Sequence, residues 1–164
     1  MSPRRAWALI LLAGEEEPAG LDAVTRSKLR RLLRERDLWV MRARLATRAI
    51  RHDLRAHPSD LARIERQPGL VRTGARFAID AGLRLHAPDA PMEFYVDART
   101  ADDLVSRFRL MPSSDPNLVL RVVPDEVRGW LHNPVAPRIA VALDLAEDRD
   151  ARSQDVAREA LSPT

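Results

Sequence analysis

Cysteine is absent from the sequence, and this absence excludes disulfides, thiolate metal ligands and cysteine nucleophiles. It is typical of a protein from a reducing compartment, so we expect the chain to be cytoplasmic. Aromatic residues make up only 4% of the chain, so Leu, Val, Ile and Ala must fill the core. No segment approaches the roughly 18–20 consecutive apolar residues of a membrane-spanning helix. We therefore expect no contact with a membrane.

The apolar run from residue 6 to residue 13 has some features of a secretion signal, because two arginines precede it. The run is short, however, and Glu15, Glu16 and Glu17 follow it at once. No Ala-x-Ala cleavage pattern is present. We predict a buried first helix over residues 4–13 that ends at Gly14.

Motifs that carry catalysis are also absent. The six glycines are scattered, so no Gly-rich phosphate loop exists, and no Gly-x-Ser-x-Gly elbow is present. The four histidines do not have the spacing of metal ligands. We predict no catalytic residue, no metal site, no cofactor and no small-molecule substrate.

One acidic pair is weighed as an exception. Asp125 and Glu126 follow Pro124, and such a pair can belong to a metal-dependent nuclease when a lysine lies close by. Lys28 is the only lysine of the chain and falls in a distant segment. We expect Pro124 to end a buried strand, because proline cannot extend the hydrogen-bond ladder, and the two acids to occupy an exposed turn. The nuclease stays the less favoured alternative.

Charge is distributed unevenly along the 164 residues. The net charge is +3, but residues 1–72 hold 16 basic and 9 acidic side chains, whereas residues 73–164 hold 11 basic and 15 acidic ones. The densest part, Arg26 to Arg55, has 11 basic residues against three acidic ones. A basic half of this kind suits an anionic partner such as nucleic acid, although a solvated helix face gives the same pattern.

The clearest amphipathic segment is predicted to start at the N-cap residue Asp22 and to end near Arg36. Val24, Leu29, Leu32 and Leu33 are its apolar positions. Arginines recur at every fourth residue on another face. The candidate DNA-binding residues are Arg26, Lys28, Arg30, Arg31 and Arg34.

The second half predicts a strand–helix–strand unit. Residues 92–97 alternate between apolar and polar, and 118–123 are apolar on both faces apart from Arg121, which is typical of an inner strand. A helix capped by Thr100 lies between them, so the two strands are expected to be parallel neighbours. The alternation at residues 50–55 indicates a further strand at the edge of the core, with a helix over 45–54 as the alternative.

Four shorter helices complete the pattern. We predict one from an N-cap at Ser59 to about Arg66, one from Thr73 or Gly74 to Ala81 with Phe77 and Ile79 packing, and two closing helices after residue 135. Near the end of the first closing helix we expect an exposed acidic patch, made of Asp144, Glu147, Asp148 and Asp150. The predicted fold class is α/β, with α+β as the alternative: a basic helical segment, residues 1–40, followed by a compact unit, residues 41–164, with a sheet of three to four strands and flanking helices.

Several stretches resemble one protein family. The stretch of residues 95–127, "YVDARTADDLVSRFRLMPSSDPNLVLRVVPDEV", and "VAPRIAVALDLAEDRDARSQDVAREAL", residues 135–161, resemble the C-terminal domain of actinobacterial AbiEi-like regulators, which are related to the antitoxins of type IV toxin–antitoxin systems. The more specific parts are Pro112-Ser113, Pro116-Asn117, residues 120–125, 135–137 and 142–145. "SPRRAWALI", "LRRLLRER" and "LRAHPSDL" extend the resemblance over most of the chain.

The resemblance implies a non-enzymatic transcriptional regulator or antitoxin-like domain that contacts DNA, a partner protein or both. Such regulators usually carry a helix-turn-helix or excisionase-like segment ahead of this domain. The sequence begins at "MSPRRAW", where the family domain starts, so we expect either a reading segment outside this sequence or a domain without its own. The alternative function is a protein-interaction module without nucleic acid, which the bipolar charge also favours through self-association.

Overall fold

The computed structural model describes residues 1–162, and this part contains one five-stranded sheet. The strand order is β2-β3-β5-β1-β4. The strands are β1 (Ile50–Arg55), β2 (Val71–Thr73), β3 (Met92–Val96), β4 (Met111–Pro112) and β5 (Leu118–Val122). The α/β class is confirmed. The expected three to four strands become five, because β2 and β4 have only three and two residues and are too short to show a period.

The centre of the sheet is the predicted parallel pair. β3 and β5 run parallel in the register Phe94 to Leu120, and the crossover helix α5 (Ala98–Arg107) joins them through β4. β1 lies antiparallel on the other side of β5, so the predicted strand at residues 50–55 is confirmed and the helical alternative is wrong. β2 pairs antiparallel with β3.

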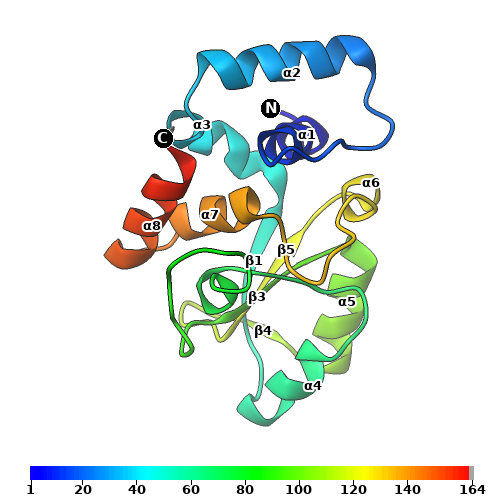
Figure 1. The fold of residues 1–164 in the computed structure, drawn as a ribbon. Helices are drawn as coiled ribbons and strands as arrows, with labels where there is room; N and C mark the ends of the chain where they lie inside the picture. The colour runs from blue at the N-terminus through cyan, green and yellow to red at the C-terminus, as the bar shows by residue number, and fades with distance from the viewer. Residues whose placement is uncertain (163–164) are drawn as a thin grey trace.

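Helices cover both faces of this sheet (Figure 1). α5 and α4 (Leu61–Glu65) lie below it in the view, whereas α7 (Arg138–Ala146) lies above it with α8 (Ala151–Leu161), α1 (Pro3–Ala13) and α3 (Leu38–Leu45). α2 (Ala23–Glu35) is the outermost element on the upper side, and α6 (Asp125–Arg128) follows β5. Short 3₁₀ turns occur at Ala46–Arg48, Pro58–Asp60 and Ala75–Phe77.

Two apolar clusters result from this layering. The smaller one joins Phe94, Leu118 and Leu120 to the α5 residues Ala101 and Leu104. The larger one joins the other face of the sheet to α1, α3, α7 and α8. As expected from the low aromatic content, aliphatic and alanine side chains make up most of both clusters.

The first helix belongs to the larger cluster. Six consecutive residues of α1, from Ala6 to Leu11, are buried, and the predicted buried helix ending at Gly14 is confirmed. α2 instead buries only Leu29 and exposes most of its surface. The two helices of the predicted 1–40 segment therefore differ: α1 lies inside the main core, and α2 lies on it.

Of the three predicted helix N-caps, one is confirmed and two are wrong. Asp22 caps α2 through a hydrogen bond from the Thr25 amide to its carboxylate, as expected. The predicted N-cap at Thr100 is wrong, because the Asp97 carboxylate accepts from the Thr100 amide and caps α5. Ser59 is likewise not a helix cap but sits within a 3₁₀ turn that precedes α4.

The helix predicted up to Ala81 is also wrong. Only a 3₁₀ turn, Ala75–Phe77, forms there, since Gly74 at φ 79° and Gly82 at φ 77° break the chain on both sides. Phe77 is buried against Phe94, whereas Ile79 is 55% exposed instead of packed. Within residues 1–162, no helix combines the length and apolar character needed to cross a membrane.

Candidate functional site

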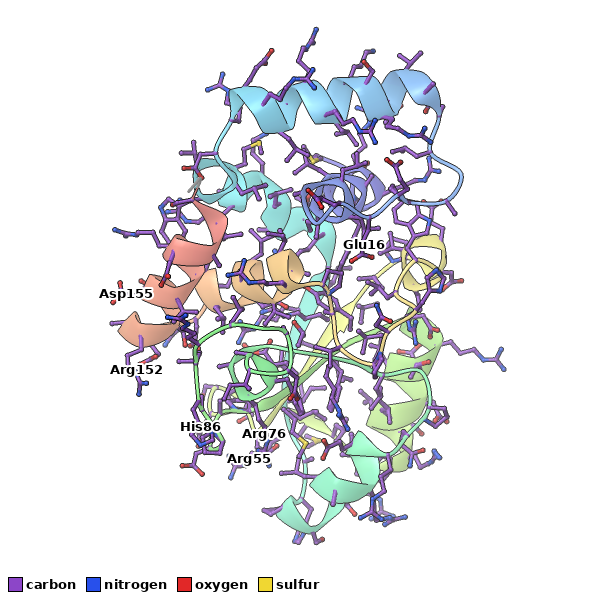
Figure 2. The ribbon with its side chains drawn as sticks, viewed as in Figure 1. Glu16, Arg55, Arg76, His86, Arg152 and Asp155 are labelled. Carbon is purple, nitrogen blue, oxygen red and sulfur yellow. The ribbon has the colours of Figure 1, made fainter. Side chains whose placement is uncertain are left out.

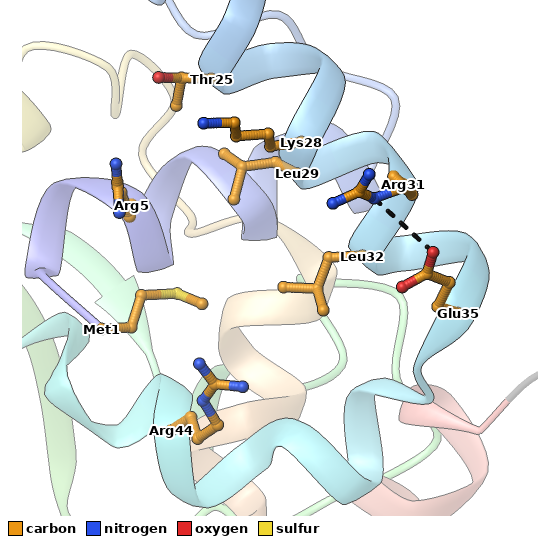
Figure 3. Close-up of a pocket in the computed structure, with 9 residues that line it drawn as sticks. All are labelled: Met1, Arg5, Thr25, Lys28, Leu29, Arg31, Leu32, Glu35 and Arg44. Carbon is orange, nitrogen blue, oxygen red and sulfur yellow. Dashed lines mark ion pairs between the residues drawn. The ribbon is translucent and has the colours of Figure 1, made fainter.

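The predicted DNA-binding residues all lie on α2 and together span its solvent-facing side. Arg26, Arg30 and Arg34 follow one another along one side at helical spacing. Lys28 and Arg31 lie on the other side, where they line a cavity together with residues of α1 and α3 (Figure 3). Leu29, between these two sides, faces the core. The cations therefore cover a broad arc of α2 opposite Leu29, with Arg31 and Arg34 at its middle.

Some of these cations already have acidic neighbours. Glu17 lies 3.2 Å from Arg26 and also pairs with Arg30, and Glu35 lies 3.7 Å from Arg31. These pairs are half-exposed, and such pairs contribute about 0–1 kcal/mol each, so an external anion can replace them at little cost. Lys28 and Arg34 have no acidic partner within residues 1–162.

The surface around α2 has an excess of positive charge. From residue 23 to residue 44 the chain holds eight basic and two acidic residues, and all eight cations are at least partly exposed. Five of these cations lie on α2 itself. A surface that exposes this many cations attracts polyanions over a distance of about one Debye length, roughly 8–10 Å.

A second cluster of charges is buried between the sheet and α7. Asp144 and Arg121 are each only 2% exposed, and Arg48 is 1% exposed. The prediction that Asp144 belongs to an exposed acidic patch is therefore wrong, whereas Glu147 is exposed as predicted. α7 places Asp144 on its buried side, and Glu147, with a side chain 29% exposed, closes the edge of the cluster.

Five segments supply this buried cluster, which we define as Arg48, Thr73, Glu93, Tyr95, Arg121, Asp144 and Glu147. Asp144 is its centre, since it accepts hydrogen bonds from Arg48, Thr73 and the Tyr95 hydroxyl, the last at 2.8 Å. Arg121 reaches Glu93 at 3.0 Å and Glu147 at 2.7 Å. Arg48 also reaches Glu147 at 2.7 Å. Each buried carboxylate thus has at least one guanidinium partner.

Asp144, whose side chain has no exposed surface, and Glu93, whose side chain is 12% exposed, have opposite electrostatic shifts. Burial opposes ionisation of Asp144, but Arg121 and Arg48 outweigh it and hold the pKa of Asp144 below its usual value. Burial dominates at Glu93 and raises its pKa, although Arg121 acts in the other direction. Asp144 is therefore the permanent anion of the cluster, and Glu93 is the group that accepts a proton first as the pH falls.

Backbone geometry makes room for Glu93. Gly74 has φ 79°, and a Cβ atom placed on it would lie 2.6 Å from the carboxyl carbon of Glu93. Only glycine fits both the conformation and the space. The close approach of the β2 end to β3 therefore depends on this residue.

The arrangement of the buried cluster is that of a structural connection. Its members bond to one another, and within residues 1–162 the two cavities that reach the cluster touch only Arg48 and Glu147 at its edge, whereas the Asp144 side chain is completely buried. The central carboxylate, Asp144, has a side chain with no exposed surface and so does not face a substrate. The cluster instead fixes α7 and the segment before β1 to one face of the sheet. One sequence signal pointed to it: an arginine inside an otherwise apolar inner strand requires a buried acidic partner.

The Asp125–Glu126 pair lies elsewhere. Both residues are exposed in the first turn of α6, directly after Pro124, as the sequence predicts. Glu126 pairs with Arg4 at 3.1 Å. In the part of the chain that the structure describes, no three His, Asp or Glu side chains gather closely enough to hold a metal ion.

Comparison with known proteins adds no relative. No protein-family model, no curated protein and no solved structure matches this chain.

Proposed function

We propose that this chain is a non-enzymatic, cytoplasmic regulator or antitoxin-like domain that contacts DNA phosphates through the cations of α2. The observation that carries this proposal is the exposed helix itself: α2 packs through Leu29 and directs arginines and a lysine to solvent. DNA phosphates neutralise such a surface, and the release of their counterions favours binding. The resemblance to AbiEi-like regulators supports the same function.

The geometry supports contacts to the DNA backbone more than contacts to bases. α2 has 13 residues and is about 20 Å long at 1.5 Å per residue, so its cations span several phosphates. Arginine and lysine contacts to phosphate position a protein but carry no sequence information. We therefore expect this surface to contribute affinity that depends on salt, with base readout left to other parts of the regulator.

The test is a DNA titration of an Arg30→Ala/Arg34→Ala double variant. Binding to a duplex from the region upstream of the coding sequence, and to a scrambled duplex, is followed by fluorescence anisotropy from 50 to 200 mM salt. Each lost phosphate contact lowers the slope of log K against log salt by about 0.9. We expect the double variant to lose about 1.8 from this slope on both duplexes.

The matched control is Arg84→Ala/Arg152→Ala, which removes two exposed arginines away from α2; Figure 2 shows Arg152 on α8. This control is expected to bind as the wild type does. An Arg30→Ala/Arg34→Ala variant with an unchanged slope would contradict the proposal.

A second candidate function is protein interaction without nucleic acid, and the edge of β1 favours it. β4 pairs with Leu54 and Arg55, and the Ser113 amide donates to the Asp53 carbonyl, so residues 50–52 have no strand on that side among residues 1–162. Ile50 is 66% exposed beside Val105, which is 38% exposed, and both line one groove. An open strand edge with apolar neighbours is suited to pairing with an extended segment.

For this candidate, a second copy of the chain is the partner to test first, because the two halves carry opposite net charges. Sedimentation equilibrium of the wild type would show self-association. Ile50→Asp should weaken this association about tenfold or more, because it removes an isoleucine that the contact between the two copies would bury. Ile79→Asp is the control, since Ile79 is the same residue type and is also exposed, at 55%, but lies outside the groove. A wild type that stays monomeric at all concentrations would rule this pairing out.

A further inference from the structure

A cavity of about 320 Å³ lies between α1, α2 and α3. Figure 3 shows side chains from all three helices around it. Leu29 and Leu32 of α2 and the side chain of Met1 point towards one another across the cavity and form its apolar floor. The volume is at the lower end of the range for small-molecule sites, about 300–1,000 Å³.

Four cations from three elements surround this floor: Arg5 of α1, Lys28 and Arg31 of α2, and Arg44 of α3. Glu35 is the only acidic residue of the lining, and it is paired with Arg31 at 3.7 Å. Arg5, Lys28 and Arg44 have no acidic partner within residues 1–162. Like charges held around one cavity repel each other. An anion inside the cavity attracts all of them, so the net electrostatic energy of the cavity becomes favourable.

The two parts of the lining require two parts of a ligand. The cations favour a carboxylate or phosphate, which guanidinium groups bind through charge-assisted hydrogen bonds. The floor favours an apolar body, because Met1, Leu29 and Leu32 offer no polar side-chain atom. We propose that this cavity binds a small organic anion, with its anionic group at Arg5, Lys28 and Arg44 and a short apolar body on Leu29 and Leu32.

Binding at this site has one consequence that rests on the proposed function. Lys28 and Arg31 belong both to the cavity and to the candidate DNA-binding residues. An anion in the cavity pairs with Lys28 and adds negative charge beside Arg31, and it therefore lowers the affinity of α2 for DNA. By linkage, DNA lowers the affinity for the anion to the same degree. The cavity is thus placed to make DNA binding responsive to a metabolite.

The probe for the test is phenyl phosphate, titrated into the full chain without DNA and followed by isothermal calorimetry and by chemical shifts of the α1–α3 amides. Inorganic phosphate and benzyl alcohol supply the anionic and the apolar half alone. We expect phenyl phosphate to bind about tenfold or more tightly than inorganic phosphate, because its ring covers the apolar floor. Benzyl alcohol is expected to show no saturable binding. Equal affinity for phenyl phosphate and inorganic phosphate would overturn the proposal.

The variants are chosen away from the DNA test. Arg44→Ala removes a cation of the cavity that is not on α2, and we expect about tenfold weaker binding of phenyl phosphate from the loss of a charged hydrogen bond. Arg84→Ala is the control and is expected to bind as the wild type. Wild-type affinity in Arg44→Ala would assign the binding to another place. Since these titrations contain no DNA, their outcome is independent of the outcome for Arg30→Ala/Arg34→Ala.

Competition is measured last, by adding phenyl phosphate to the DNA complex at constant ionic strength. A lower DNA affinity in the wild type, but not in Arg44→Ala, supports the shared use of Lys28 and Arg31. An unchanged DNA affinity at saturating phenyl phosphate would contradict the proposal that DNA and the anion share Lys28 and Arg31. Binding of the anion in the cavity would still be tested by the titration without DNA.

Discussion

Replacing Asp144 with asparagine is expected to lower the free energy of unfolding by about 3–5 kcal/mol at neutral pH. Asp144 is 2% exposed and accepts hydrogen bonds from Arg48, Thr73 and Tyr95. The amide of asparagine turns an –NH₂ group towards these donors and removes the negative charge that compensates two buried guanidinium groups. The loss is a large part of the roughly 5–15 kcal/mol that stabilises a domain of this size.

Urea denaturation measures the effect as a lower midpoint with an unchanged m-value. Asp155→Asn is the matched control, because it makes the same chemical change at an exposed position of α8, labelled in Figure 2. We expect the control to stay within about 0.5 kcal/mol of the wild type. A loss below about 1 kcal/mol in Asp144→Asn would contradict the central place given to this carboxylate.

The pH dependence of the free energy of unfolding is a second, independent test of the role of Asp144. The pKa of Asp144 is lower in the folded state than in the unfolded chain, so its contribution to stability is complete above the unfolded pKa and disappears as the pH falls through the folded pKa. The difference between wild type and Asp144→Asn should therefore be largest near pH 7 and shrink below about pH 4. A difference that grew on acidification would have the wrong sign.

Glu93 is expected to behave in the opposite way. Its pKa is raised in the folded state, so any stabilisation from its proton is present below the unfolded pKa and is lost as the pH rises through the folded pKa. Glu93→Gln fixes a neutral side chain that still accepts from Arg121, and it should cost less than Asp144→Asn at pH 7. The two variants together separate the permanent anion from the titrating one.

The strands that carry the buried cluster can be predicted from the sequence, but the contacts within the cluster cannot. The period-two pattern at residues 92–97 and the apolar run at 118–123 predict the two parallel strands, because each pattern is local. The role of Asp144 depends on contacts with Arg48, Thr73 and Tyr95, which lie 96, 71 and 49 residues away along the chain. A single Asp within "VALDLAED" looks solvent-exposed when its neighbours Glu147, Asp148 and Asp150 are also acidic. Only the folded structure shows that one side of α7 carries this carboxylate inward.

For α2, the sequence predicts the helix and its buried side but not the ion pairs or the cavity. Asp22 as the cap and Leu29 as a buried position follow from helical spacing, and both are confirmed. The pairing of Arg26 and Arg30 with Glu17 was not, because Glu17 lies in the loop before α2 and has no fixed spacing to it. The cavity required all three N-terminal helices in place before Arg5 and Arg44 could be seen near Lys28.

Replacing Trp7 with alanine is the second change with a large expected effect, a loss of about 3–5 kcal/mol. Trp7 is fully buried, its indole N–H donates to the Arg48 carbonyl at 3.0 Å, and its ring packs edge-on against Tyr95 at 4.9 Å between centroids. Alanine leaves a cavity between α1 and the sheet and an unpaired carbonyl beside the buried cluster. Trp7→Phe keeps most of the ring and should cost about 1–3 kcal/mol for the lost hydrogen bond.

Trp130→Ala is the matched control, since Trp130 also donates its indole N–H to a backbone carbonyl, that of Ala19, but is only partly buried. We expect less than half the loss seen for Trp7→Ala.

The Trp7 variant also tests the predicted boundary near residue 40. If α1 were a separable lead-in, Trp7→Ala would melt the N-terminal helices and leave the remaining unit with wild-type stability, so that fluorescence and circular dichroism would show two transitions. α1 instead shares one apolar cluster with α7, α8 and the sheet, and residues in one packed core unfold together. We therefore expect a single transition with a lower midpoint by both probes. α2 packs on α1, so the two helices are expected to unfold together with the rest of the chain. Trp7→Ala should therefore weaken DNA binding only under conditions in which the whole chain is unfolded.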